Sequence, residues 1–290
     1  MTDYWKKYQV KEDEHIKLTD WDTSYEGELT KDEVYGKALP ENLDKLAAFQ
    51  NVLYADNRYG LLIVLQAMDA AGKDGLIKHV FTAMDPQGTQ VSSFKKPSSL
   101  ELDHDYLWRC NLHLPRRGNV MIFNRSHYED VLVTRVHNLL EAEGSQFPKE
   151  LSGGNLWKRR FKEIRNWEEY LTQNGIVVLK FFLHISKEEQ KERLLSRIDE
   201  EEKNWKFSSA DINERKYWDD YQHAYEEMIS ATSTSHAPWF IIPADRKWYT
   251  RYVVSEIVKK QFESMSIAYP ALPEKEKESL REWRNILTNE

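Results

Sequence analysis

The chain has 290 residues, of which 40% are hydrophobic and 31% charged, a balance typical of a globular protein. Its formal net charge of −7 excludes nucleic-acid binding through overall positive charge. The single cysteine, Cys110, excludes a disulfide within the chain, and we expect it to be a buried apolar residue in a reducing cytoplasm.

The first 40 residues are polar, rich in Trp and Tyr and weakly periodic, so we expect an extended arm that lies on the body. They lack the apolar core of a secretion signal, and no stretch approaches the roughly 18 apolar residues of a membrane helix. Residues 40–60 carry apolar side chains near the 3.6-residue period, which predicts a helix that ends at Gly60.

The apolar run 61–66 predicts a buried strand, and a helical pattern begins near Lys73. The connection resembles a Walker A phosphate-binding loop, G-x-x-x-x-G-K-[ST], with two departures. Ala67 stands in place of the first glycine, and Asp74 stands in place of the serine or threonine that holds magnesium. We therefore expect a slightly different first turn and a different metal ligand.

The loop can still bind an anion despite the departures at Ala67 and Asp74. A helix N-terminus offers free backbone N–H groups, Gly72 permits close approach, and Lys73 adds a positive charge. Asp69 and Asp74 are the hard oxygen ligands that could replace the lost hydroxyl, and Asp69, inside the loop, is the favoured one. The loop alone leaves open a strand–turn–helix without a ligand.

Two further strands are expected at 89–94 and 120–123, separated by a helix over 99–114 whose leucines stand at heptad spacing. A second helix begins near Ser126. Asn124 ends the strand where a Walker B motif has aspartate, and Arg125 and Glu129 follow, four residues apart. Arg125 and Glu129 form either a surface ion pair or part of a site that faces the Lys73 loop. Because charged residues follow both strands, at the Lys73 loop and at Arg125, the site is favoured.

The remaining pattern continues this alternation. Helices are expected over 155–175, 186–203, 215–229 and 247–265, and strands over 176–185 and 239–244. Ser186 and Glu189 read as a capping box, and residues 270–290 as a loosely held charged helix. Alternating strands and helices predict a parallel sheet covered on both faces, with ligands bound beyond the carboxyl ends of the strands.

Basic residues recur in this acidic chain beyond the need of a nucleotide. Each alone is typical of a solvated face, but together they indicate a long polyanionic ligand. They are Lys95, Lys96, Arg116, Arg117, the stretch 158–165, Arg193, Arg197, Lys203 and Lys206.

Five stretches resemble the polyphosphate kinase 2 family, in that family's order and over about residues 45 to 262. They are LQAMDAAGKDG (65–75), FKKPSSLELDHDYLWR (94–109), LPRRGNVMIFNRSHYEDVL (114–132), WKFSSADINERKYWDDY (205–221) and APWFIIPADRKWYTR (237–251). The resemblance implies a three-layer α/β/α P-loop kinase fold with a parallel sheet and a helical lid, similar to thymidylate kinase. It implies an arm at 1–40, a kinase core at 41–265 with the lid at about 193–220, and a charged tail at 266–290.

The resemblance also implies the reaction. The terminal phosphoryl group of inorganic polyphosphate is transferred reversibly, with Mg²⁺ or a substituting Mn²⁺, to a nucleotide. NRSHYED at 124–130 resembles the branch that uses both AMP and ADP; adenine nucleotides are the expected substrates, and guanine nucleotides are left open as an alternative. A homo-oligomer, dimer or tetramer, is expected in the cytoplasm, without nucleic-acid or membrane partners.

Site residues are carried over as follows. The family's loop carboxylate and lysine fall on Asp69 and Lys73, and the strand-end arginine and the branch-marking glutamate on Arg125 and Glu129. Asp69 and Asn124 are expected to hold the metal. Binding of polyphosphate and nucleotide is expected from Ala70, Ala71, Gly72, Asp74, Lys95, Lys96, Arg116, Arg117 and the lid residues Arg193, Arg197 and Lys203.

Two rival functions remain open from the sequence. The same loop would suit an ATP-dependent kinase for a nucleotide or small molecule, although the missing hydroxyl at Asp74 and the surplus of basic residues count against it. A non-catalytic sensor of nucleotide or polyphosphate is the second. Turnover with polyphosphate separates the prediction from both.

Overall fold

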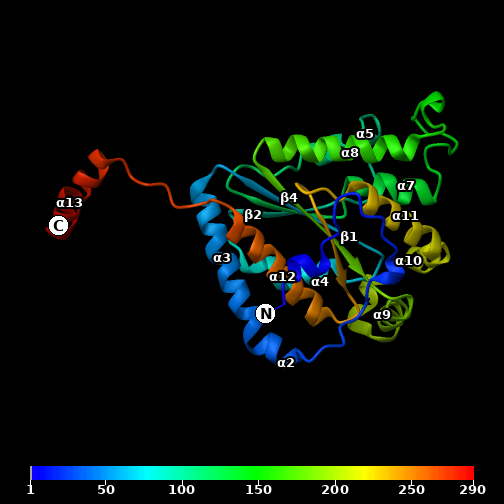
Figure 1. Cartoon of the computed structure of the whole chain (residues 1–290), viewed down its shortest axis with the longest axis horizontal. Coiled ribbons are helices and arrows are strands. Elements are labelled where there is room, and N and C mark those ends of the chain that lie inside the picture. The colour runs from blue at the N-terminus through cyan, green and yellow to red at the C-terminus, as the bar shows by residue number, and fades with distance from the viewer. Residues whose placement is uncertain (1) are drawn as a thin grey trace.

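The computed structural model describes residues 2–290, and its centre is a five-stranded, fully parallel sheet in the order β2-β3-β1-β4-β5. The strands are β1 Gly60–Ala67, β2 Thr89–Ser93, β3 Val120–Asn124, β4 Ile176–His184 and β5 Trp239–Pro243. Helices cover both faces (Figure 1). The predicted three-layer α/β/α architecture is confirmed.

Strands β1, β4 and β5 are apolar because both of their faces are covered. All eight residues of β1 are buried, as are the last seven of β4 and all five of β5. One face is covered by α1 Tyr4–Tyr8, α3 Leu39–Asp56, α4 Lys73–Val80 and α12 Lys247–Ser264, which pack on one another. On the other lie α7 Val133–Val136, α8 Leu156–Gln173 and α11 Trp218–Thr232.

The region between β4 and α11 forms a projection beside the carboxyl ends of the strands (Figure 1). It consists of α9 Lys187–Asp199, η6 Glu201–Lys206, α10 Ser209–Glu214 and η7 Arg215–Tyr217. The predicted capping box is half formed. Ser186 Oγ accepts from the Glu189 N–H, but the Ser186 N–H donates to Asp245 and the Glu189 carboxylate pairs with Arg193.

The single helix predicted over 99–114 was wrong. The structure has two short helices, α5 Ser99–Leu102 and α6 Trp108–Asn111. A capping box between Ser98 and Glu101 begins the first, and an Asp105 side chain that accepts from the Leu107 N–H turns the chain before the second. Leu100 is 61% exposed, so the heptad spacing marks no buried seam.

The helix expected near Ser126 is a 3₁₀ helix, η4 His127–Val131. Ser126 caps it by accepting from the Tyr128 N–H. This tight turn places successive side chains on different sides of the segment, which matters for the site described below.

Residues 2–38 are less extended than predicted. They contain α1, η1 Leu18–Asp20, α2 Lys31–Glu33 and the π-helical turn η2 Val34–Ala38. The Val10 N–H donates to the Trp239 carbonyl at 2.9 Å, and the Tyr8 and Tyr249 hydroxyls lie 2.7 Å apart. Apolar arm residues thereby join the core, namely Tyr8, Val10, Ile16 and Leu18.

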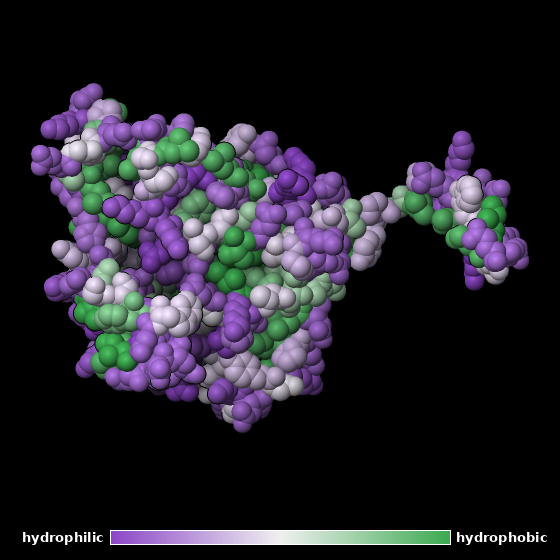
Figure 2. Space-filling view, turned by 180° about the vertical axis from the view of Figure 1, so that it is seen from behind, coloured by the Kyte–Doolittle hydropathy of each residue, from purple (hydrophilic) through white to green (hydrophobic). Residues whose placement is uncertain are grey.

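The last helix, α13 Glu274–Thr288, stands away from the body at the end of an extended segment (Figure 1). Figure 2 shows hydrophobic side chains on this projecting piece, and Leu280, Trp283 and Leu287 are 52%, 58% and 69% exposed. Among residues 2–290, no helix combines the length and the apolar character needed to cross a membrane.

Candidate active site

The loop after β1 makes its turns at positions that the Walker pattern does not mark. Ala67 remains in the strand and is buried, so it needs no glycine conformation. The left-handed backbone falls instead on Ala70, with φ of 60°, and on Gly72, with φ of 111°. The first turn is therefore shifted into the loop, which explains why alanine is accommodated at Ala67.

Side chains hold the carbonyl oxygens of this loop, residues 67–71, in place. Lys73 Nζ donates to the carbonyls of Ala67 and Met68, at 2.8 and 3.3 Å. Gln190 Nε2 donates to the Asp69 carbonyl at 2.9 Å. Arg193 Nη1 donates to the carbonyls of Ala70 and Ala71, at 3.0 and 2.8 Å. With these carbonyls engaged, the N–H groups at the N-terminus of α4 are the ones that an anion can reach.

Lys73 is 9% exposed and lies among charged groups. Burial, followed by the nearby Arg125 guanidinium, lowers the pKa of Lys73 to about 8, and three carboxylates oppose this effect. Those carboxylates belong to Asp69, Glu129 and Asp74. A phosphate beside this ammonium would favour its charged form.

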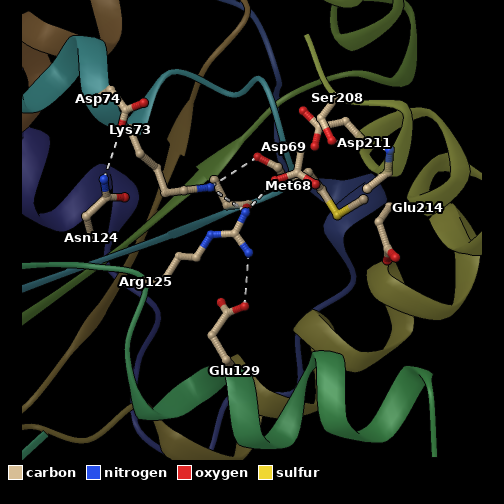
Figure 3. A network of polar contacts seen from close by, with 12 residues as sticks. Met68, Asp69, Lys73, Asp74, Asn124, Arg125, Glu129, Ser208, Asp211 and Glu214 are labelled. Atoms are coloured by element: carbon tan, nitrogen blue, oxygen red, sulfur yellow. Dashed lines mark hydrogen bonds and ion pairs between the residues drawn. The ribbon is translucent and has the colours of Figure 1, made fainter. Parts of the chain in front are cut away.

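Arg125 lies between two carboxylates at the end of β3 (Figure 3). Its Nη2 donates to Asp69 Oδ1 at 2.6 Å and its Nη1 to Glu129 Oε2 at 3.2 Å. Burial alone would lower the pKa of Arg125, but Glu129 and Asp69 outweigh it and raise that pKa. The structure thus brings together four predicted residues, Asp69, Lys73, Arg125 and Glu129.

The predicted metal pair is not brought together directly. Asn124 Nδ2 donates to Asp74 Oδ1 at 2.7 Å, while the Asp69 carboxylate is held by Arg125 (Figure 3). Adjacent parallel strands β1 and β3 carry the two loops, so Asn124 meets the start of α4 rather than the loop interior.

Among residues 2–290, no three His, Cys, Asp or Glu side chains gather closely enough to hold a metal by themselves. Magnesium in phosphoryl-transfer sites usually takes one or two carboxylates and completes its shell with water and substrate phosphates. Asp69 and Asp74, both near Lys73, supply that kind of donor set. The oxygen chemistry of the site therefore fits Mg²⁺ bound together with a phosphate substrate.

One wall of the cleft beside Arg125 was not predicted. Residues of α10 and α11 line it together with Asp69, Arg125 and Glu129; they are Glu214, Tyr221 and Tyr225. The Tyr221 hydroxyl donates to Glu214 Oε2 at 2.8 Å, and His137 Nε2 lies 2.9 Å from the same oxygen. In the sequence these aromatic residues look like an ordinary buried helix face, so only the topology reveals that they border the cleft.

The three basic residues predicted for the lid have other partners. All three nitrogens of Arg193 are engaged, with Glu189 and with four backbone carbonyls of the β1 and β5 loops. Arg197 pairs with Asp211 at 2.7 Å, and Lys203 with Glu200 and Ser196. Arg193 was predicted to bind polyphosphate or nucleotide, but in the structure its guanidinium is occupied by Glu189 and by backbone carbonyls, so it stabilises the loops after β1 and β5.

The residues predicted to bind polyphosphate lie at opposite ends of the parallel strands. Lys95 and Lys96 are exposed just beyond the carboxyl end of β2, the same edge as the Lys73 loop. Arg117 donates to the Arg58 and Asn174 carbonyls, which precede β1 and β4. Arg116 and Arg117 therefore lie at the amino ends of the strands, whereas the Lys73 loop lies at the carboxyl ends.

Two basic residues of α12, Lys247 and Arg251, lie near Arg193 and α4. The pKa of Lys247 is lowered by partial burial and by the charges of Arg193, Lys203 and Arg251. The Arg251 guanidinium lies 3.5 Å from the position that a Cβ on Gly75 would take. Both side chains belong to the stretch 237–251, which resembled the family, but nothing in its spacing marked them individually.

Comparison with known proteins gives consistent results. A family model described as Polyphosphate kinase 2 (PPK2) matches residues 29–270. The ADP-polyphosphate phosphotransferase of Rhodopseudomonas palustris is 46% identical over 97% of this chain and 98% of its own length. The AMP/ADP-polyphosphate phosphotransferase of Meiothermus ruber is 44% identical over 91% and 95%.

A solved structure agrees with these relatives. The crystal structure of polyphosphate kinase 2 from Arthrobacter aurescens TC1 matches with a TM-score of 0.85 and 36% identity, covering 97% of each chain.

Proposed function

Since this chain belongs to the polyphosphate kinase 2 family, we propose that it transfers the terminal phosphoryl group of inorganic polyphosphate to AMP and to ADP. The relatives named above are, by name, phosphotransferases that act on polyphosphate with ADP, or with both AMP and ADP. The observation that carries the proposal is the placement of two cationic groups, Lys73 and Arg125, near each other at the carboxyl ends of β1 and β3.

The chemistry requires little from the protein beyond positioning and charge. A terminal phosphate oxygen of the nucleotide attacks the terminal phosphorus of polyphosphate, and the bond from that phosphorus to the bridging oxygen breaks. The nucleotide gains one phosphate and the polymer loses one. The attacking oxygen is already anionic, so no strong general base is needed, and the main barrier is repulsion between two polyanions.

Lys73 and the amides at the start of α4 are assigned to the phosphates being exchanged. Arg125 is assigned to the transferring phosphoryl group, and its carboxylate partners, Asp69 and Glu129, hold its guanidinium in one orientation. When bound, Mg²⁺ would neutralise phosphate charge, with Asp69 and Asp74 as its protein ligands. Asn124 would act on Asp74 by hydrogen bonding.

Glu129 supports use of both nucleotides. NRSHYED resembles the branch that handles AMP and ADP, and Glu129 lies in the cleft beside Arg125. The aromatic wall of Tyr221 and Tyr225 is the candidate surface for the nucleotide. The projection formed by α9, η6 and α10 is the candidate lid, and Lys247, Arg251, Lys95 and Lys96 are candidates for the polyphosphate path.

The test is a nucleotide assay with purified protein, polyphosphate, Mg²⁺ and AMP, followed by chromatography. We expect ADP to appear first and ATP after it, and EDTA to stop both steps until Mg²⁺ or Mn²⁺ is added in excess. Accumulation of ADP alone would contradict the use of both nucleotides. Turnover with ATP and an acceptor, but none with polyphosphate, would select a conventional kinase instead.

Two companion measurements address the remaining expectations. Starting from ATP and short polyphosphate, formation of ADP and longer chains would show that the reaction is reversible. Light scattering on the same sample would decide between a monomer and the proposed dimer or tetramer.

A further inference from the structure

A fully buried polar network is attached to the segment that carries Arg125 and Glu129, and the reaction described above does not use it. We call Tyr128, Glu168, Lys180 and Thr232 the buried network; each is 0% exposed. Lys180 Nζ donates to Glu168 Oε2 at 2.5 Å, to the Thr232 carbonyl at 2.7 Å and to the Tyr128 hydroxyl oxygen at 3.0 Å. The Tyr128 hydroxyl donates to Glu168 Oε1 at 2.7 Å.

The network joins the middle of the sheet to the segment that carries the site. Lys180 belongs to β4 and Glu168 to α8, whereas Tyr128 lies in η4 between Arg125 and Glu129. Its ring therefore anchors the short stretch from which both charged side chains enter the cleft. Ser126 Oγ, which caps this turn, accepts a second tether from Gln66 Nε2 of β1 at 3.1 Å.

This segment has a backbone conformation that needs support. Arg125 adopts φ of 63°, in the left-handed region that residues with a side chain rarely occupy. Ser126 follows in a fully extended conformation, with φ of −163° and ψ of −165°. Such a kink persists only where the surroundings fix it, and the Tyr128 hydroxyl is fixed three residues further on.

Stability alone does not account for the network. A buried ion pair loses the hydration of two charges, so apolar side chains of similar volume are often as stabilising. Burial alone would raise the pKa of Glu168, but Lys180 and His127 together outweigh it and lower that pKa, so Glu168 stays an acceptor. Burial, followed by the Glu168 charge, raises the pKa of Tyr128 well above 10, so its hydroxyl stays a donor. These fixed roles define one orientation of Tyr128.

We propose that Tyr128, held by Glu168 and Lys180, is a positioning residue that sets the placement of Arg125 and Glu129 for phosphoryl transfer. The proposal rests on the proposed function, because it assigns Arg125 to the transferring group. Arg125 donates to carboxylates on two different segments, so a shift of its backbone would misalign both ion pairs.

The test is Tyr128→Phe, which removes one oxygen and keeps the ring. We expect kcat to fall by about ten- to a hundredfold, since small misplacements of positioned groups cost rates of this order. The KM values for ADP and polyphosphate should change by less than about twofold, because Lys73 and the loop are untouched. Tyr8→Phe is the matched control: it removes a buried, hydrogen-bonded hydroxyl far from the cleft and should keep the wild-type kcat.

A double-mutant cycle separates positioning from loss of stability. If Tyr128 acts through Arg125, adding Tyr128→Phe to Arg125→Lys should lower kcat by less than about twofold further. Amide hydrogen exchange of residues 125–131 should accelerate in Tyr128→Phe while the rest of the sheet is unchanged. A second variant, Glu168→Leu with Lys180→Met, replaces the ion pair by apolar side chains, removes both side-chain partners of the Tyr128 hydroxyl and should reproduce the loss of kcat.

The outcomes are distinguishable. A wild-type kcat in Tyr128→Phe, or an equal loss in the Arg125→Lys background, would overturn the positioning role. Absence of polyphosphate turnover in the wild-type protein would overturn the proposed function, and hydrogen exchange at 125–131 would still report whether Tyr128 holds the segment.

Discussion

Arg125 is the residue on which the cleft is centred, because it is bonded to carboxylates from two loops. Arg125→Lys keeps the charge but cannot donate to Asp69 and Glu129 from one planar group. We expect kcat to fall by about 10²- to 10³-fold with little change in thermal stability. Steady-state kinetics with ADP and polyphosphate would measure this.

The control for that variant is Arg58→Lys. Arg58 also binds a carboxylate through two nitrogens, but Asp56 and Arg58 lie at the amino edge of the sheet. A similar loss of kcat in both variants would show that the effect does not come from the cleft.

Lys73 should make stability depend on pH in a definite direction. Its pKa falls from an ordinary 10.5 to about 8 in the folded protein, because of burial and then Arg125. Below pH 8 the ammonium is charged in both states, and its burial destabilises the fold in full. As pH rises from 8 to 10.5 the folded state releases its proton first, so this penalty disappears.

The comparison is with Lys73→Met, in which the titrating group is absent. Relative to that variant, the wild type should gain up to about 3 kcal/mol in unfolding free energy between pH 7 and pH 10.5, from about 1.4 kcal/mol per pKa unit. Denaturant titrations at several pH values would show it. A parallel pH dependence of the two proteins would contradict the assignment.

Individual site residues could be predicted from the sequence where they directly follow a strand. Asp69, Lys73, Arg125 and Glu129 were predicted from their place beyond β1 and β3, and parallel strands bring those ends together. Arg193 could not be placed, because its partners are backbone carbonyls without any sequence signature. Arg116 and Arg117 were assigned to the wrong end of the strands, because the prediction counted basic residues and did not consider that these two precede a strand.

Among the elements, the loop after β1 allows the sharpest test of conformation. Gly72 has φ of 111°, and a Cβ there would meet only Arg193 Nη1, at 3.7 Å. The cost of Gly72→Ala is therefore conformational rather than steric, and we expect about 1 to 2 kcal/mol of destabilisation. Thermal or chemical denaturation would measure it.

Gly153→Ala provides the comparison, since a Cβ there meets nothing within 4 Å and its φ is not positive. It should change the unfolding free energy by less than about 0.5 kcal/mol. Equal effects at the two glycines would show that the loop conformation at Gly72 costs alanine nothing.

Elements with a continuous apolar pattern were the ones that could be predicted. β1, β4 and α8 appear close to their expected bounds because burial on both faces, or on one stripe, imposes the pattern. The stretch 99–114 was mistaken for one helix because capping and turn side chains, not periodicity, decide its breaks. The 3₁₀ geometry of η4 likewise depends on Ser126 and Tyr128, whose partners are distant in sequence.

For the whole molecule, α13 should be dispensable to the stability of the body. No residue of α13 is buried, and its side-chain hydrogen bonds stay within the helix. Removal of residues 274–290 should shift the thermal midpoint by less than about 1 °C, because almost no buried surface is lost. Calorimetry of the full and shortened chains would test this; a large decrease would reveal contacts in an assembly.

The arm has consequences for how the chain is made. Tyr8 and Val10 are translated early, yet their partners, Tyr249 and Trp239, come more than 220 residues later. During synthesis the N-terminal arm therefore cannot form these contacts until β5 and α12 have left the ribosome. The contacts it closes are the most non-local in the body and should form last, which makes arm docking the step most exposed to delay and misassembly in a newly made chain.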